Sequence, residues 1–194
     1  MIDTPEKAEN ITFAEVSGTP CPPPKGITPR PGQIVCGDVD IRINAEGAWF
    51  HNGSPITRKK LVQLFATVVR RDEAGDYWLI TPAEMARIKV DDAPFLAVEM
   101  LETNDNGVRY LKFRTNVDSW ITADANHPIR VAIAPNSGEP RPYLRLFEDG
   151  TEARINRAVF YELVNNAVVA EVDGRSMLTI DSAGEFFILG PASE

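Results

Sequence analysis

One set of side chains in this sequence has the types needed for nucleophilic catalysis. Cys36 supplies a thiol, His127 a base and Asp38 a carboxylate that could orient the base, and such a set activates a nucleophile when its members meet in space. A structural role for the thiol is the stronger interpretation, because Cys36 stands beside Gly37 at the start of an expected strand, where a small buried residue is usual. We therefore expect no catalytic residues, and an enzyme that uses Cys36 or His127 is the least favoured alternative.

Sequence motifs for metal and nucleotide binding are not found. The two histidines and two cysteines lack the paired spacing of a zinc site. No segment matches the phosphate loops Gly-x-Gly-x-x-Gly or Gly-x-x-x-x-Gly-Lys-Ser/Thr, so the classical nucleotide-binding folds are excluded. We predict no metal and no cofactor.

Two arginines stand where an anion could bind. Arg58 and Arg157 occupy the same first-turn position of two expected helices, and free amides together with the positive end of the helix dipole favour an anion there. Arginine on a solvated surface is the competing explanation, because a duplication copies neutral residues too. Tyr161, at the edge of the apolar stripe of the second helix, could show its hydroxyl to solvent or to a ligand.

The two helices that carry these arginines belong to an internal duplication. Residues 56–64 align with residues 155–163, so the second copy stands 99 positions after the first. Thr57 and Asn156 occupy matching positions, where their side-chain oxygens could cap the first helical turn. The two copies are therefore expected to share one backbone path.

Both helices are predicted to be amphipathic. Apolar residues recur at the i, i+3, i+4, i+7 spacing of one helix face, and this face must be covered by other elements. The residues are Leu61, Leu64, Phe65 and Val68 in the first copy and Phe160, Leu163, Val164 and Ala167 in the second.

Turn signals and alternating residues place hairpins around each helix. Asn52-Gly53 and Asp149-Gly150 are two-residue hairpin turns upstream of the helices, and residues 77–81 and 176–180 downstream are typical of strands. The fold class is therefore α+β, with two duplicated hairpin-helix-hairpin units and mostly antiparallel sheets. Further strands are expected at 40–44, 48–50, 85–90, 95–102, 108–115, 129–134, 143–147 and 185–189, and a loop at 135–142.

Composition divides the chain into three parts. Six prolines between Thr19 and Gly32 are too many for a helix or a central strand, which indicates that residues 1–33 form an extended arm. A polar break at Asp91 to Pro94 is the expected boundary between a first unit, residues 34–92, and a second, strand-rich unit, residues 93–194.

The charge balance limits the partners. The 194 residues carry a formal charge of −8, which argues against binding a nucleic-acid polymer or an anionic membrane, since both need clustered lysine and arginine. No apolar stretch is long enough to span a bilayer. We expect a soluble cytoplasmic protein in which Cys21 and Cys36 stay reduced, and the sequence leaves its oligomeric state open.

Several fragments, in order, resemble an uncharacterised bacterial family, domain of unknown function 1285. The likeness runs from about Cys36 to Gly190, and an ordered set of fragments is far more specific than any one of them. The fragments are Cys36-Gly37-Asp38, Trp49-Phe50, Gly53-Ser54-Pro55-Ile56, Leu64-Phe65, Thr81-Pro82-Ala83-Glu84, Val90-Asp91-Asp92-Ala93-Pro94-Phe95, Thr115-Asn116 and His127-Pro128.

The resemblance implies two related domains, the second similar to pleckstrin-homology folds, with a nucleotide-type ligand between them and a role in stress signalling. It brings no catalytic residues. Its fragments and the two helix starts together give a predicted ligand-binding site. The site residues are Arg58, Asn116, His127, Arg130, Arg157 and Tyr161.

We therefore expect a non-enzymatic regulatory or signal-transduction protein. Its ligand would be a small anion, with nucleotides among the candidates, bound in the groove between the duplicated units, because paired units leave a concave seam. The main alternative is a protein-interaction adaptor without a small ligand.

Overall fold

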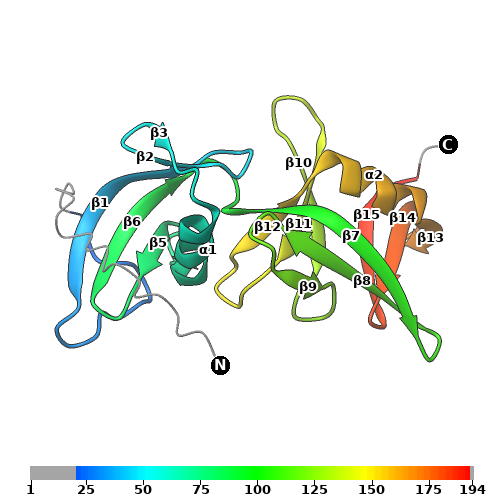
Figure 1. Cartoon of the computed structure of the whole chain (residues 1–194). Helices are drawn as coiled ribbons and strands as arrows, with labels where there is room; N and C mark the ends of the chain where they lie inside the picture. The colour runs from blue at the N-terminus through cyan, green and yellow to red at the C-terminus, as the bar shows by residue number, and fades with distance from the viewer. Residues whose placement is uncertain (1–20, 193–194) are drawn as a thin grey trace, which may run out of the picture.

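The computed structural model describes residues 21–192, which form two units, each made of strands and one helix (Figure 1). In the first unit six strands form one sheet in the order β3-β2-β1-β6-β5-β4, and every pair is antiparallel except β1 and β6. The elements are β1 (Ile34–Ile43), β2 (Trp49–His51), β3 (Ser54–Pro55), α1 (Lys59–Val68), β4 (Val69–Arg71), β5 (Tyr77–Ile80) and β6 (Glu84–Val90).

The second unit has a six-stranded sheet, β10-β11-β12-β7-β8-β9, and a three-stranded sheet, β13-β14-β15. Only β7 and β12 are parallel, so the sheets of the described chain are mostly antiparallel, as predicted. The elements are β7 (Phe95–Asp105), β8 (Val108–Thr115), β9 (Trp120–Thr122), β10 (Ile129–Ile133), β11 (Pro140–Arg145), β12 (Glu152–Ile155), α2 (Arg157–Asn165), β13 (Val168–Val172), β14 (Arg175–Ser182) and β15 (Glu185–Pro191).

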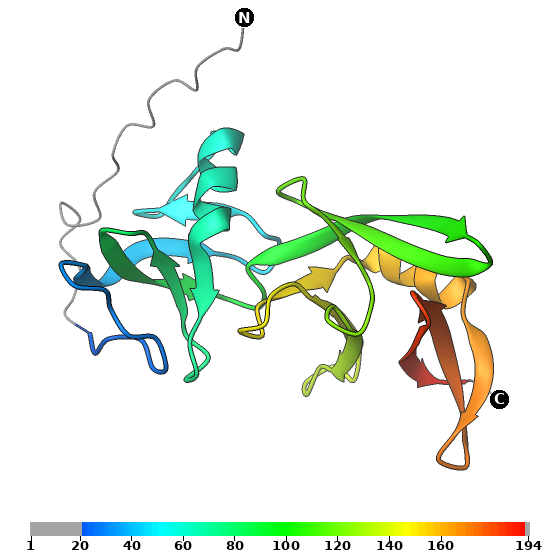
Figure 2. The ribbon, with the colours of Figure 1, turned by 90° about the horizontal axis from the view of Figure 1, so that it is seen from below.

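Both units follow the same path around their helix, which confirms the duplication and the α+β class. Three antiparallel strands precede each helix, β1-β2-β3 before α1 and β10-β11-β12 before α2, and an antiparallel hairpin follows it. In the first unit β6 then pairs with β1, and in the second unit β15 lies against β10. Strands β7, β8 and β9 have no counterpart in the first unit, and Figure 2 shows the β7–β8 hairpin alongside α2.

The buried face of α1 differs from the predicted one. Leu64, expected at the centre of the apolar stripe, is 48% exposed, whereas Phe65 and Ala66 are buried. The helix is turned by about 100°, the angle of one residue, because Phe65 stacks on Trp49 with ring centroids 6.0 Å apart. The prediction for Leu64 is wrong, while that for its counterpart Leu163, which is 0% exposed, is confirmed.

The two helix starts also differ. Asn156 caps α2 as predicted, since its side chain accepts a hydrogen bond from the Val159 amide at 2.8 Å. Thr57 does not cap α1, because the helix begins one residue later than expected. Arg58 is the N-cap residue, with extended backbone and no side-chain bond to the first turn.

This difference predicts unequal effects at the two aligned positions. Asn156→Ala should lower the free energy of unfolding by about 1 kcal/mol, because an amide of the first turn loses its acceptor. Thr57→Ala should change it by less than about 0.5 kcal/mol. Urea unfolding at constant slope measures both, and equal losses at the two positions would contradict the assigned caps.

One expected loop is part of a strand. The prolines between residues 135 and 142 favour a loop, yet β11 already begins at Pro140, which pairs with Ile133, and Pro142 pairs with Val131. Prolines are tolerated there because β12 pairs only with the later part of β11, from Tyr143 onwards. The proline segment therefore needs hydrogen-bond partners on one side only.

Direct hydrogen bonds join the two units, which also share one hydrophobic core. The side chain of Asn116 donates to the carbonyl of Gly47 in the first unit at 3.2 Å and accepts from the amide of Leu96 at 3.1 Å. A Cβ atom on Gly47, whose φ is +72°, would lie 2.7 Å from the Asn116 amide nitrogen. Glycine is therefore needed at this turn.

Residues 21–33 contain no helix or strand and run beside the first unit. The amide of Lys25 donates to the buried carboxylate of Asp72 at 3.1 Å, which ties this segment to the turn after β4. The remaining residues of the expected arm, 1–20, lie outside the described residues. Cys21 and Cys36 are both free thiols, and among the described residues no helix has the length and apolar character needed to cross a membrane.

Candidate functional site

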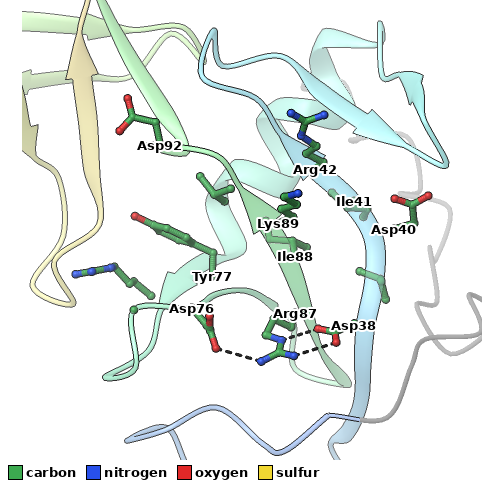
Figure 3. A pocket seen from close by; sticks show the side chains of 14 residues that line it. Asp38, Asp40, Ile41, Arg42, Asp76, Tyr77, Arg87, Ile88, Lys89 and Asp92 are labelled. Carbon is green, nitrogen blue, oxygen red and sulfur yellow. Dashed lines mark hydrogen bonds and ion pairs between the residues drawn. The ribbon is translucent and has the colours of Figure 1, made fainter. Parts of the chain in front are cut away.

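The outer face of the first sheet forms a broad polar hollow of about 710 Å³ (Figure 3). Arg87 lies between two carboxylates that line this hollow. Its Nε atom is 2.5 Å from a carboxylate oxygen of Asp38, and its Nη1 atom is 3.1 Å from a carboxylate oxygen of Asp76. The hydrogen bonds from Arg87 lower the pKa of Asp38 below its usual range. Arg42, higher on the same face, is held by Asp91. These charges largely neutralise one another, so the hollow is not a dedicated anion site.

A second concavity of about 380 Å³ lies where the two units meet, and we call it the inter-unit arginine pocket. One lining residue, Arg71 at the end of β4, comes from the first unit, and the others come from the second. They are Pro128, Arg130, Arg145, Gly150 and Glu152. Three arginines against one glutamate give this pocket a net positive charge within an acidic protein.

Arg71 is fixed by its backbone and free at its side chain. Its amide donates to the Asp149 carboxylate at 3.0 Å, a bond between the units. Its guanidinium lies beside Gly150, where a Cβ atom would come within 3.1 Å of it. Among the described residues Arg71 and Arg145 form no ion pair, so both can receive an anion.

Arg130 is the preorganised member of the pocket. It bonds the Glu152 carboxylate, with its Nε atom at 2.6 Å, and its guanidinium lies 4.3 Å from the ring centre of Tyr143. The hydrogen bond to Glu152 raises the pKa of Arg130, so the residue stays charged. Register explains the geometry, because Arg130 and Tyr143 are cross-strand neighbours on β10 and β11.

Sequence comparisons place the chain in a family. A family model described as a domain of unknown function (DUF1285), N-terminal domain, matches residues 30–93. A second, described as protein of unknown function (DUF1285), C-terminal domain, matches residues 94–189. The chain belongs to the DUF1285 family. No curated protein matches it.

Two solved structures of DUF1285 proteins are similar to this one. The protein from Silicibacter pomeroyi DSS-3 is 36% identical, with a TM-score of 0.73, and the match covers 87% of this chain and 91% of that one. The protein from Shewanella baltica OS155 is 27% identical, with a TM-score of 0.51, over 66% of this chain and 91% of that one. The fold is thus shared over most of the chain with the first protein and over about two thirds of it with the second.

The predicted site residues do not meet in one place. Arg130 lines the inter-unit arginine pocket, and His127 precedes its lining residue Pro128, but the His127 ring contacts Asp124 at 3.0 Å. Asn116 uses its side-chain amide in the bond to Gly47, which joins the units, and in a bond from Leu96 within the second unit. Arg58 is exposed at the start of α1, and it lines none of four concavities found among residues 21–192.

Arg157 and Tyr161 do come together, in a separate concavity of about 280 Å³ that we call the α2 pocket. The Nε atom of Arg157 donates to the Tyr161 hydroxyl at 2.8 Å, and its guanidinium lies 5.4 Å from the ring centre. This hydrogen bond raises the pKa of Arg157. The other lining residues are Glu139, Pro140, Arg141, Pro142, Arg154, Ile155 and Phe160.

Sequence reasoning missed Arg71 and Arg145. Arg71 was visible only as half of the Arg70-Arg71 pair at the end of the first duplicated helix, which is typical of a solvated surface. A signal for Arg145 does exist, because Arg141, Tyr143 and Arg145 alternate along β11 and therefore project from one face.

The groups considered for nucleophilic catalysis have other partners. Asp38 is bonded to Arg87 and His127 contacts Asp124, so Asp38 does not orient the histidine. Burial raises the pKa of the Cys36 thiol, and Glu84 raises it further, which disfavours the thiolate that nucleophilic attack requires. Within residues 21–192 no group of three or more His, Cys, Asp or Glu side chains could hold a metal ion.

Proposed function

We propose that this DUF1285 protein is a non-enzymatic cytoplasmic regulator that binds a small anionic ligand in the inter-unit arginine pocket. One observation carries the proposal. The guanidinium of Arg71, from the first unit, has no ion-pair partner among the described residues and lines a pocket whose other residues belong to the second unit.

The lining groups suit phosphate or a comparable oxyanion. Guanidinium groups present forked donors that match two oxygens at once, and Arg145 and Arg71 are both available for such contacts. Arg130 is stacked on Tyr143 and paired with Glu152, so it supplies a fixed donor face. Charge-assisted hydrogen bonds contribute about 1.5–3 kcal/mol each, and several of them would give micromolar affinity.

The position of the pocket supports a regulatory role. A ligand that contacts Arg71 and Arg145 at once would bind the two-unit arrangement more tightly than any arrangement in which the units separate. Binding would therefore stabilise the inter-unit contact, and a ligand can shift such an equilibrium only through this difference in affinity. Nucleotides are candidates because their phosphates carry the required charge.

Calorimetry with phosphate, pyrophosphate and a panel of mono- and dinucleotides tests the proposal at low and moderate salt. We expect at least one of these anions to bind, and Arg71→Gln or Arg145→Gln to weaken it by about tenfold or more. The matched control is Arg175→Gln. Like Arg145, Arg175 is exposed and forms no ion pair in the part of the chain that is described, but it lies at the β13–β14 turn.

Two outcomes would contradict the proposal. Undetectable heats for every anion would favour the alternative, a protein-interaction adaptor without a small ligand. Binding that Arg175→Gln weakens as much as Arg71→Gln would show a diffuse surface effect instead of a site. Arg58→Gln should also leave the affinity unchanged, since Arg58 lies at the start of α1 outside this pocket.

A further inference from the structure

The inter-unit arginine pocket and the α2 pocket stand at opposite ends of one strand, β11. Arg145, its last residue, lines the first pocket, and Arg141, near its start, lines the second. Both side chains project from the same face because they are four residues apart and side chains alternate along a strand. At about 3.4 Å per residue, their Cα atoms are about 13–14 Å apart.

Each end of this strand carries excess positive charge. In the α2 pocket two arginines, Arg141 and Arg157, face one glutamate, Glu139, while the third lining arginine, Arg154, is paired with Asp92. Arg141 and Arg157 form no ion pair within residues 21–192, and the Arg157 guanidinium bonds the Tyr161 hydroxyl and lies near its ring. The α2 pocket therefore carries net positive charge, as the inter-unit arginine pocket does, with separate residues.

The stretch between the two ends is neutral. Arg130, Tyr143 and Arg154 form one row across β10, β11 and β12. Arg130 is neutralised by Glu152, and Arg154 by Asp92 at 3.1 Å. Asp92 also accepts a hydrogen bond from the Tyr143 hydroxyl at 2.7 Å. Burial and, to a lesser degree, this hydrogen bond raise the pKa of Tyr143 to about 12, so the phenol stays uncharged. The middle of the face thus offers no unpaired charge.

We propose that the two pockets bind the two ends of one elongated ligand that carries an anionic group at each end and an uncharged middle. This inference rests on the proposed function, since one anionic end occupies the inter-unit arginine pocket. A single anion fills one pocket, whereas a ligand with two anions about 13 Å apart gains the second contact at high effective concentration.

Alkane bisphosphonates of increasing length, from propane to dodecane, test the spacing by calorimetry, with methylphosphonate as the single-anion probe. Affinity should rise with length, reach a maximum when the chain spans both pockets and exceed that of methylphosphonate by at least about tenfold. Arg141→Gln and Arg157→Gln should remove this gain, so that the best bisphosphonate binds them no more tightly than methylphosphonate does. Arg71→Gln should weaken both kinds of probe, and Arg175→Gln neither.

The possible failures are distinguishable. If methylphosphonate binds in an Arg71-dependent way but chain length and Arg141→Gln have no effect, the bridging ligand is overturned and the proposed function stands. If no phosphonate binds, both are overturned. A length optimum that Arg141→Gln and Arg157→Gln leave intact would also overturn the assignment of the second anion to the α2 pocket.

Discussion

Leu163→Ala should lower the free energy of unfolding by about 2–5 kcal/mol, whereas Leu64→Ala at the aligned position should change it by less than about 0.5 kcal/mol. Leu163 is fully buried in α2, so truncation leaves a cavity among its neighbours. Leu64 is 48% exposed on α1, so truncation mainly removes surface already in water. The two residues are a matched pair, because both are leucines within the duplicated helices.

Urea unfolding at constant slope compares the two variants directly. A loss at Leu64 as large as that at Leu163 would mean that α1 packs with the phase predicted from its sequence, and the rotated helix would be wrong. Phe65→Ala supplies the complementary variant, since Phe65 is 7% exposed and stacks on Trp49. It should be far more destabilising than Leu64→Ala.

Asp72→Ala should cost at least about 3 kcal/mol, although aspartate is a polar residue in a turn. Asp72 is 6% exposed and its carboxylate accepts four hydrogen bonds, so its loss leaves buried donors without an acceptor. The donors are the amides of Lys25, Ala74 and Asp76 and the indole N–H of Trp78, at 2.9–3.1 Å. A cost below about 1 kcal/mol would show that the donors find other acceptors.

The buried carboxylate of Asp72 should also make the stability of the fold depend on pH. Burial alone would raise the pKa of Asp72, but the hydrogen bonds from Lys25, Asp76, Trp78 and Ala74 outweigh it, and the pKa in the folded protein is lowered. The unfolded chain therefore binds the proton more readily, so the stabilisation is complete above about pH 4 and is lost as the pH falls through the folded pKa. In urea titrations at decreasing pH, the free energy of unfolding of Asp72→Asn should fall less than that of the wild type over this acid range. An unchanged acid slope would contradict the assignment.

The fold was largely readable from the sequence because local signals agreed with the tertiary structure. Turn dipeptides and alternating residues define the hairpins, and the 99-residue offset defines the repeated helix. The sequence could not reveal the phase of α1, since Leu64 and Phe65 are equally apolar and only the position of Trp49 selects between them. Nor could it show that Thr57 falls one residue before the cap.

The site was less predictable because it depends on contacts between units. Arg130 was predicted from its place beside a fragment of the family resemblance. Arg71 joins it in the pocket only through the bond from its amide to Asp149, which no local pattern encodes. Arg157 and Tyr161 were predicted as members of one site, and they do lie near each other, as residues one helical turn apart do. Asn116 was predicted as a site residue because it belongs to the Thr115-Asn116 fragment, and in the structure it joins the units.

The central claim, that an oxyanion binds between the two units, is tested most directly by anomalous diffraction from crystals soaked in selenate or tungstate. We predict an anomalous peak within hydrogen-bond distance of the guanidinium groups of Arg71, Arg130 and Arg145. This peak should be absent from Arg71→Gln crystals soaked under the same conditions. Peaks confined to other arginines, such as Arg58 or Arg175, or no peak at all in this pocket, would contradict the account.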